Sequence, residues 1–161
     1  MKKTFLLLTL LFFSLCFGQQ NVSTFYFIRH AEKVDDSKNP DLSEIGLKRA
    51  QQWKSILSEI HFDEIYSTDF KRTMQTATPI ATEQNLVIKS YDPKTLSVES
   101  FKNENLNKKV LMVGHSNSIP KFINQLILYN LFPDIPDDVF GNLYVITITG
   151  ETISYQLLKL P

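Results

Sequence analysis

Two histidines stand directly after short apolar segments that lie far apart in the sequence. Residues 25–28 are followed by Arg29 and His30, and residues 110–113 lead through a glycine to His115. Short apolar segments that end at polar residues are typical of buried parallel strands. Because ligands of open parallel sheets bind outside the carboxyl ends of the strands, we expect both histidines to meet in one site. Histidines beside an arginine indicate a site for an anion.

A tetrahedral phosphoryl group matches the chemistry of these side chains. Arg29 and Arg72 carry planar, permanently charged guanidinium groups that donate several hydrogen bonds each. A neutral His30 can attack phosphorus if one ring nitrogen stays bare while the other donates to a nearby backbone carbonyl. We expect His115 to be charged and to stabilise the negative charge that develops on the oxygens.

The residues after the second apolar segment favour a bound anion as well. Gly114 lets the backbone come close, and Ser116, Asn117 and Ser118 begin a helix whose free N–H groups attract negative charge. Ser116 and Asn117 are therefore predicted to bind the substrate together with the two arginines and His115.

Helical and strand-like segments alternate along the chain, which predicts a single α/β domain. Strands are expected at residues 25–28, 62–67, 86–91 and 110–113, and helices at residues 42–60, 73–84, 97–106 and 118–131. The first helix is expected from apolar residues at helical spacing, namely Leu42, Ile45, Leu47, Ala50, Trp53, Ile56, Leu57 and Ile60. Asp41 or Ser43 is expected to cap it, and Pro79 to kink or interrupt the second helix. Residues 143–149 and 152–158 alternate in polarity around a Gly-Glu turn, which predicts an antiparallel hairpin at one edge of the sheet.

With these motifs the chain resembles the histidine phosphatase superfamily, also called the phosphoglycerate mutase-like family. The resemblance spans nearly the whole chain after its apolar N-terminus. It consists of four motifs in order: Arg-His-Ala-Glu-Lys at residues 29–33; Leu-Ser-Glu at residues 42–44 with Gly46 and Ala50; Tyr-Ser-Thr at residues 66–68 with Arg72, Thr76 and Ala77; and Val-Gly-His-Ser-Asn at residues 113–117.

The resemblance implies a three-layer α/β/α sandwich with a mostly parallel central sheet. It also implies that His30 is the phosphorylated nucleophile, that Arg29, Arg72 and His115 complete the phosphate pocket, and that the chemistry needs no metal or other cofactor. Many members read Arg-His-Gly where this chain has Arg-His-Ala. With this small change the chain resembles a subgroup of short exported or signalling members.

The proton donor is expected on the variable segment between Arg72 and His115. Asp92, directly after a predicted strand, is the first candidate, Glu99 is the second, and Glu32 follows well behind. A carboxylic acid there would protonate the leaving oxygen and later activate water.

The N-terminus reads as a secretory signal peptide over residues 1–18. Two lysines precede an apolar stretch at residues 5–17, which is shorter than the roughly 20 residues that span a bilayer, and cleavage is expected after Gly18. A lipid anchor on Cys16 is the less favoured alternative, because the residue before it is bulky. The mature chain, residues 19–161, would form one domain without cysteine in the periplasm or outside the cell.

The charge balance of that mature chain, 15 basic against 17 acidic residues, gives no reason to expect nucleic acid or an anionic membrane as a partner. Three acidic residues between prolines, Asp134, Asp137 and Asp138, are read as a solvated turn rather than a cation site. His61 belongs to no motif and is read as a residue at a helix end.

We therefore expect an exported, metal-independent phosphomonoesterase of the histidine acid phosphatase type, working through a phosphohistidine on His30. Its expected substrates are phosphorylated small molecules, envelope sugars or lipid-linked phosphates. Two alternatives stay open: a phosphohistidine or phosphoprotein phosphatase, and a non-catalytic phosphate-binding module of the same fold. A mutase is disfavoured because the short stretches between the motifs leave little room for a lid.

Overall fold

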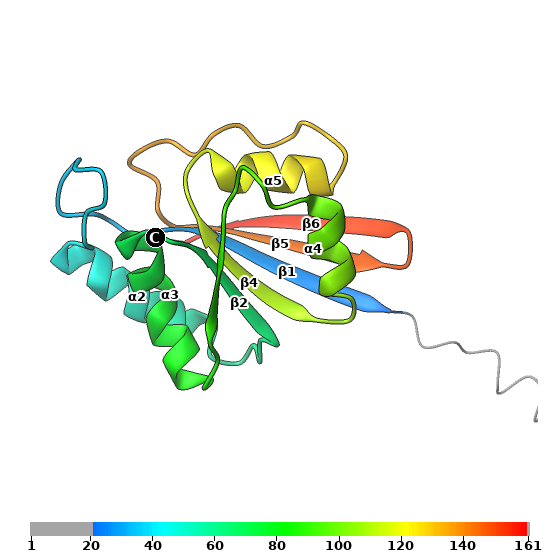
Figure 1. Cartoon of the computed structure of the whole chain (residues 1–161), viewed down its shortest axis with the longest axis horizontal. Coiled ribbons are helices and arrows are strands. Elements are labelled where there is room, and N and C mark those ends of the chain that lie inside the picture. The colour runs from blue at the N-terminus through cyan, green and yellow to red at the C-terminus, as the bar shows by residue number, and fades with distance from the viewer. Residues whose placement is uncertain (1–20, 161) are drawn as a thin grey trace, which may run out of the picture.

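The structure is a computed structural model that describes residues 21–160 (Figure 1). The predicted signal peptide, its cleavage point and Cys16 lie outside the described residues. The strands are β1 (Val22–Arg29), β2 (Glu64–Thr68), β3 (Ile88–Tyr91), β4 (Lys109–Gly114), β5 (Asn142–Thr149) and β6 (Thr152–Lys159). The helices are α2 (Glu44–Ile56), α3 (Lys71–Glu83), α4 (Val98–Glu104) and α5 (Ser118–Leu126). Within this part of the chain, no helix is long and apolar enough to cross a bilayer.

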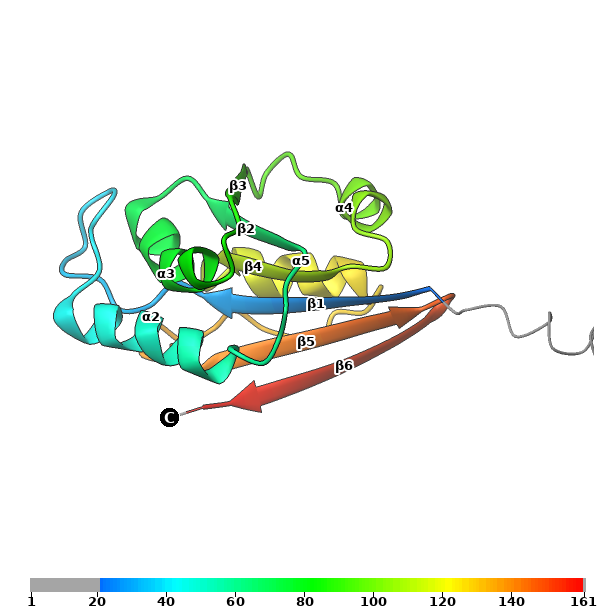
Figure 2. The ribbon, with the colours of Figure 1, turned by 90° about the horizontal axis from the view of Figure 1, so that it is seen from below.

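The described strands form one mixed sheet in the order β3-β2-β4-β1-β5-β6. Strands β3, β2, β4 and β1 run parallel to their neighbours, whereas β5 pairs antiparallel with β1 and β6 pairs antiparallel with β5. Figure 2 shows the β5–β6 hairpin, in orange and red, at one edge of the sheet. Gly150 turns this hairpin with a φ of +58°, a conformation that glycine adopts at no steric cost. The predicted hairpin is confirmed.

Helices cover both faces of the sheet, which confirms the three-layer α/β/α arrangement. Alternate residues of each strand point to opposite faces. Phe27 and Met112 pack with residues of α4 and α5, and Ile28 and Leu111 pack with residues of α2 and α3. Figure 1 shows the two helix pairs on either side of the fanned strands. The central strands are buried on both faces, which explains why they read as continuous apolar runs.

Helix α2 begins after Ser43, whose hydroxyl accepts a hydrogen bond from the N–H of Gly46 at 3.1 Å. This result confirms the cap on Ser43. A Cβ on Gly46 would lie 2.1 Å from the carbonyl oxygen of Glu32, so glycine is required for the close contact between α2 and the segment after β1. That contact fixes which face of α2 turns inward.

The prediction of the apolar face of α2 is wrong for some of its residues. Gly46, Ala50 and Trp53 are buried, whereas Ile45 and Ile56 are about half exposed or more, as is Leu47. The buried face of α2 is narrow because Gly46 packs directly against the backbone of Glu32. The apolar residues beside this face are therefore exposed to solvent.

Two other predicted helix features are the interruption at Pro79 and the end of the last helix, and the structure has neither as predicted. Helix α3 runs without interruption through Pro79; proline removes one backbone donor, and the buried Ala77 and Ile80 on the same helix still hold it to the sheet. Helix α5 ends at Leu126 rather than at residue 131. The side chain of Asn124 explains that end, because it binds backbone atoms of residues 131 and 132 at 2.8–3.1 Å and clamps the returning chain.

Candidate active site

The two histidines meet because their strands are neighbours. Arg29 at the end of β1 pairs with Gly114 at the end of β4, and the N–H of His30 donates to the carbonyl of Gly114 at 2.9 Å. The ring centroids of His30 and His115 lie 5.5 Å apart. A Cβ on Gly114 would lie 2.6 Å from the hydroxyl of Tyr91 and 2.8 Å from the side chain of Ile119, so glycine leaves room for these side chains at the end of β4. The expected convergence of two distant segments is confirmed.

His30 is held with one ring nitrogen bare. Its Nδ1 lies 2.7 Å from the carbonyl oxygen of Ala31, and because a carbonyl only accepts, Nδ1 carries the proton and Nε2 has a free lone pair. The residue is only 5% exposed. Burial, joined by the charges of Arg29, His115 and Arg72, outweighs the hydrogen bond to Ala31 and lowers the pKa of His30 to about 3. His30 is therefore neutral at physiological pH, which a nucleophile requires.

Neighbouring side chains fix the tautomer of His115. Arg72 can only donate, so its Nη2, 3.3 Å from Nδ1 of His115, makes that nitrogen the acceptor. Nε2 then carries the proton and donates to the hydroxyl of Thr68 at 3.0 Å. The Thr68 hydroxyl donates in turn to Thr73, which donates to backbone carbonyls. This chain of hydrogen bonds begins on β2 and fixes the ring orientation.

The protein's own groups favour the neutral form of His115. Burial, followed by the charges of Arg72 and Arg29, lowers the pKa of His115 to about 4. A positive imidazolium between two guanidinium groups is unfavourable until an anion enters. The charge predicted for His115 concerns a bound phosphoryl group, whose negative charge would act against this repulsion.

Arg29 both binds a neighbouring backbone segment and lines the pocket. It is 4% exposed, and its Nη1 donates to the carbonyl oxygens of Pro136, Asp137 and Val139 at 2.7–3.1 Å. Its guanidinium also lies over the ring of Phe140 at 4.3 Å. The buried Nε has no hydrogen-bond partner among the described residues. Arg29 thus fixes the 136–139 segment and keeps a buried donor unpaired.

Arg72 lies in the first turn of α3, which begins two residues before the predicted helix. Its guanidinium lies 4.6 Å from the ring centre of Phe70 and contacts His115 as described. It is half-buried, so most of its donors remain available. Thr76, one turn further along α3, accepts from the N–H of Ala31 at 3.0 Å and so ties α3 to the segment that carries His30.

These side chains line one cavity of about 700 Å³. Its wall contains every predicted phosphate-binding residue: Arg29, His30, Arg72, His115, Ser116 and Asn117. The remaining lining residues are Lys33, Asp36, Ser37, Asp134 and Asp137. The sequence predicts a solvated turn at Asp134 and Asp137 and carries no local signal that the segment folds back over the pocket.

The candidate proton donors lie elsewhere. Asp92 is exposed and its carboxylate accepts from the N–H of Lys94 at 2.9 Å, and Glu99 is exposed on the first turn of α4. Neither belongs to the wall of the cavity. Glu32 forms an ion pair with Arg49 at 2.8 Å. His61 is exposed and is also absent from the cavity wall.

Comparison with known proteins supports the interpretation reached from the geometry. The model of the histidine phosphatase superfamily (branch 1) matches residues 25–93. Phosphoserine phosphatase 1 of Hydrogenobacter thermophilus is 41% identical over 68 residues, which cover 38% of this chain. The match spans only 32% of the length of that relative.

Solved structures share the fold at low sequence identity. Phosphoglycerate mutase from Bacillus anthracis has a TM-score of 0.65 at 16% identity, with 88% of this chain and 93% of that chain covered. The α-ribazole phosphatase from Shigella flexneri has a TM-score of 0.63 at 14% identity, with 85% and 96% covered. Residues 25–93 are therefore similar to the histidine phosphatase superfamily, and the chain shares the fold of these solved structures.

Proposed function

We propose that the protein is an exported phosphatase that hydrolyses phosphomonoesters through a covalent phosphohistidine on His30. One observation carries the proposal: a neutral, buried imidazole with a bare Nε2 faces a cavity that it shares with two guanidinium groups and a second imidazole. The phosphoserine phosphatase and α-ribazole phosphatase similar to this chain give the same reaction class.

In the first proposed step, Nε2 of His30 attacks phosphorus and the bond to the leaving alcohol oxygen breaks. Arg29 and Arg72 hold the phosphoryl oxygens in line with the attack. The hydrogen bond from Nδ1 to Ala31 keeps the ring oriented and stabilises the positive charge that it gains. In the second step water attacks the phosphohistidine, which releases phosphate and restores the neutral ring.

His115 is proposed to acquire its charge only when the anion is bound. A phosphoryl group that takes over the contacts of Arg72 leaves Nδ1 of His115 open to a proton, which it can then donate to an oxygen. The negative charge of the bound group favours that protonation. The site would therefore take up a proton as it binds a dianion.

The leaving oxygen also needs a proton. Asp92 and Glu99 remain the predicted donors, and both lie outside the cavity wall. Asp92 would have to act after movement of the segment that joins β3 to α4, and Glu99 after movement of α4. Removing the true donor slows turnover of an ester with a poor leaving group and barely affects one with a good leaving group. Asp92→Asn and Glu99→Gln are to be compared on this basis.

Export and the substrate class complete the proposal. The signal peptide predicted at residues 1–18 supports export to the periplasm or out of the cell, where envelope sugars and lipid-linked phosphates would be accessible substrates. We propose that no metal takes part, because two arginines and a His115 that is protonated when the anion binds supply the positive charge that the phosphoryl group requires. No stable membrane insertion is proposed for the mature chain.

The test is hydrolysis of a generic aryl phosphate by the purified protein in the presence of a chelator, beside His30→Ala. Turnover by the wild type alone supports the metal-independent enzyme. Wild-type turnover that the chelator abolishes contradicts metal independence. If neither protein turns over substrate but both bind phosphate or vanadate, the protein is a phosphate-binding module and the proposed activity is wrong.

A further inference from the structure

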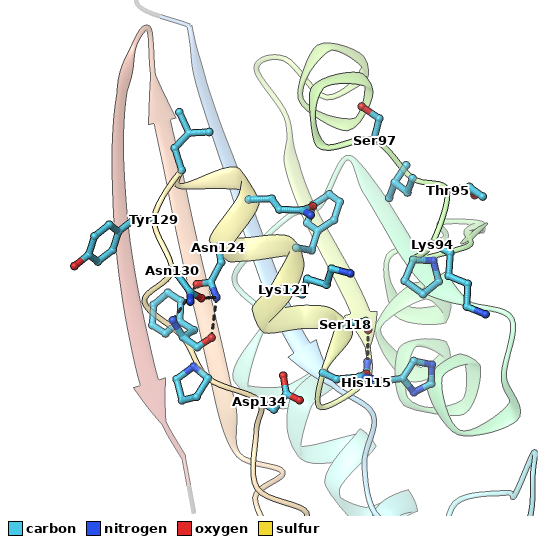
Figure 3. Close-up of a pocket in the computed structure, with 18 residues that line it drawn as sticks. Lys94, Thr95, Ser97, His115, Ser118, Lys121, Asn124, Tyr129, Asn130 and Asp134 are labelled. Atoms are coloured by element: carbon cyan, nitrogen blue, oxygen red, sulfur yellow. Dashed lines mark hydrogen bonds between the residues drawn. The ribbon is translucent and has the colours of Figure 1, made fainter.

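A second, larger cavity opens directly beside the phosphate pocket. It measures about 1200 Å³ and shares His115, Asn117 and Asp134 with the smaller cavity, so the two adjoin. Its walls are the segment between β3 and α4 on one side and α5 with the chain that follows it on the other. Figure 3 shows these two walls, with His115 at one end of the cavity. A phosphoryl group at His115 would therefore place the rest of its molecule in this cavity.

The size of the cavity suits an organic group rather than water alone. Small-molecule sites commonly measure about 300–1,000 Å³ and combine apolar walls with a few polar groups. Leu96, Phe122 and Phe132 line the cavity and pack against the core, whereas Leu128 and Tyr129 line it while largely exposed. This composition fits a substrate whose alcohol portion has a carbon skeleton of several atoms or a ring.

The charged groups of the cavity favour an anion on that skeleton. Lys121 on α5 and Lys94 on the opposite wall line it, against one carboxylate, Asp134, at the boundary with the phosphate pocket. In Figure 3 the side chain of Lys121 extends from α5 across the cavity toward the segment that carries Lys94 and Thr95. Among the described residues, the Lys121 ammonium has neither an ion pair nor a hydrogen-bond partner. Lys121 is thus a positive group that faces the cavity without a counter-ion from the protein.

We infer that Lys121 recognises a second anionic group on the substrate, a carboxylate or a second phosphate carried by the alcohol portion. The inference rests on the proposed phosphatase function and refines it, because it names the substrate class: phosphomonoesters with an additional negative charge on the leaving group. The ammonium of Lys121 would donate to that group while His30 attacks the phosphoryl group in the adjoining pocket.

The experiment compares two aryl phosphates of matched shape, one with a carboxylate and one with a carboxamide at the meta position of the ring. We expect the wild-type protein to show a kcat/KM about fivefold higher for the carboxylate, the value of one well-placed, partly solvated ion pair. Lys121→Gln should bring this ratio close to one, and Lys121→Arg should keep it. Lys48 is an exposed lysine on α2 that does not line the cavity, so Lys48→Gln controls for the loss of one positive charge elsewhere.

A wild-type ratio near one, or a ratio that survives Lys121→Gln, overturns the inference while leaving the phosphatase function intact. The inference also fails if Lys48→Gln lowers the ratio as far as Lys121→Gln does, because the effect then comes from net charge. If neither ester is hydrolysed, the proposed function fails instead. Titration with the two matching methylene phosphonates then decides the binding question, since the same ratio must appear in their Kd values.

Discussion

Acid should destabilise this fold through the two pocket histidines. Burial holds the pKa of His30 at about 3 and that of His115 at about 4, whereas an unfolded histidine titrates near 6.5. Below pH 6.5 the unfolded state therefore binds two protons that the folded state does not bind. The free energy of unfolding must fall as the pH falls through this range, because protonation favours the unfolded state.

The size of the loss follows from these values. Between pH 7 and pH 5 each histidine lowers the free energy of unfolding by about 2 kcal/mol, at about 1.4 kcal/mol per pH unit below the unfolded pKa. The loss over this interval depends mainly on the unfolded pKa of 6.5, because both folded values lie below pH 5. The pair together should account for about 4 kcal/mol.

His30→Asn isolates one of the two contributions. The asparagine Nδ2 occupies the position of Nδ1 and can still donate to the carbonyl of Ala31, so the local structure is maintained while the titrating group is removed. The variant should lose about 2 kcal/mol less than the wild type between pH 7 and pH 5.

The assay is urea unfolding of each protein at the two pH values, followed by circular dichroism. His61→Gln is the matched control, because it removes an exposed histidine that does not line the pocket, and it should show the wild-type loss. Equal pH dependence in the wild type and His30→Asn would mean that His30 is not held neutral by burial, and the argument for the nucleophile would fail.

Three further outcomes are expected. Gly46→Ala places a Cβ 2.1 Å from the backbone oxygen of Glu32, so it should lower the free energy of unfolding by about 2 kcal/mol or more in urea titration; no loss would show that α2 can move away freely. Thr76→Val leaves the buried N–H of Ala31 without an acceptor and should cost about 1–3 kcal/mol in the same assay, whereas Thr76→Ser should restore most of the stability. Sulfate binding should take up a proton at pH 6, measured by calorimetry in buffers of different ionisation enthalpy, because the dianion raises the depressed pKa of His115; zero uptake would contradict the proposed charging of that residue.

The fold could be predicted from the sequence where local pattern and tertiary burial agree. The runs at residues 25–28 and 110–113 are apolar because β1 and β4 are buried on both faces, so the pattern predicted their positions and that both are parallel strands. The hairpin was predictable from alternation around Gly150. In each case the local sequence and the tertiary environment require the same residues.

The sequence pattern failed where a distant contact decides the local structure. The inward face of α2 is set by the contact of Gly46 with Glu32, so counting apolar residues at helical spacing also selected Ile45 and Ile56. The end of α5 is set by the hydrogen bonds of Asn124 with the returning chain. Such contacts are visible only after the chain has folded.

The candidate site shows the same division. Arg29, His30, Arg72 and His115 could be selected because they follow strands or begin helices, positions that the sequence pattern locates. The 134–139 segment carries no such signal, and its place over the pocket depends on Arg29 binding three of its carbonyls. The charge state of His115 depends on two arginines from other segments, so it could not be read from its own neighbours in the sequence.

The central claim is that His30 becomes covalently phosphorylated during turnover. The direct measurement is rapid quenching of the protein with an aryl phosphate, followed by mass spectrometry of the peptide that contains His30. We predict a phosphoryl group on His30 that survives alkali and is lost in acid. Its rate of hydrolysis should be at least as high as kcat. Turnover without this intermediate, or a phosphoryl group found on His115 instead, would contradict the account.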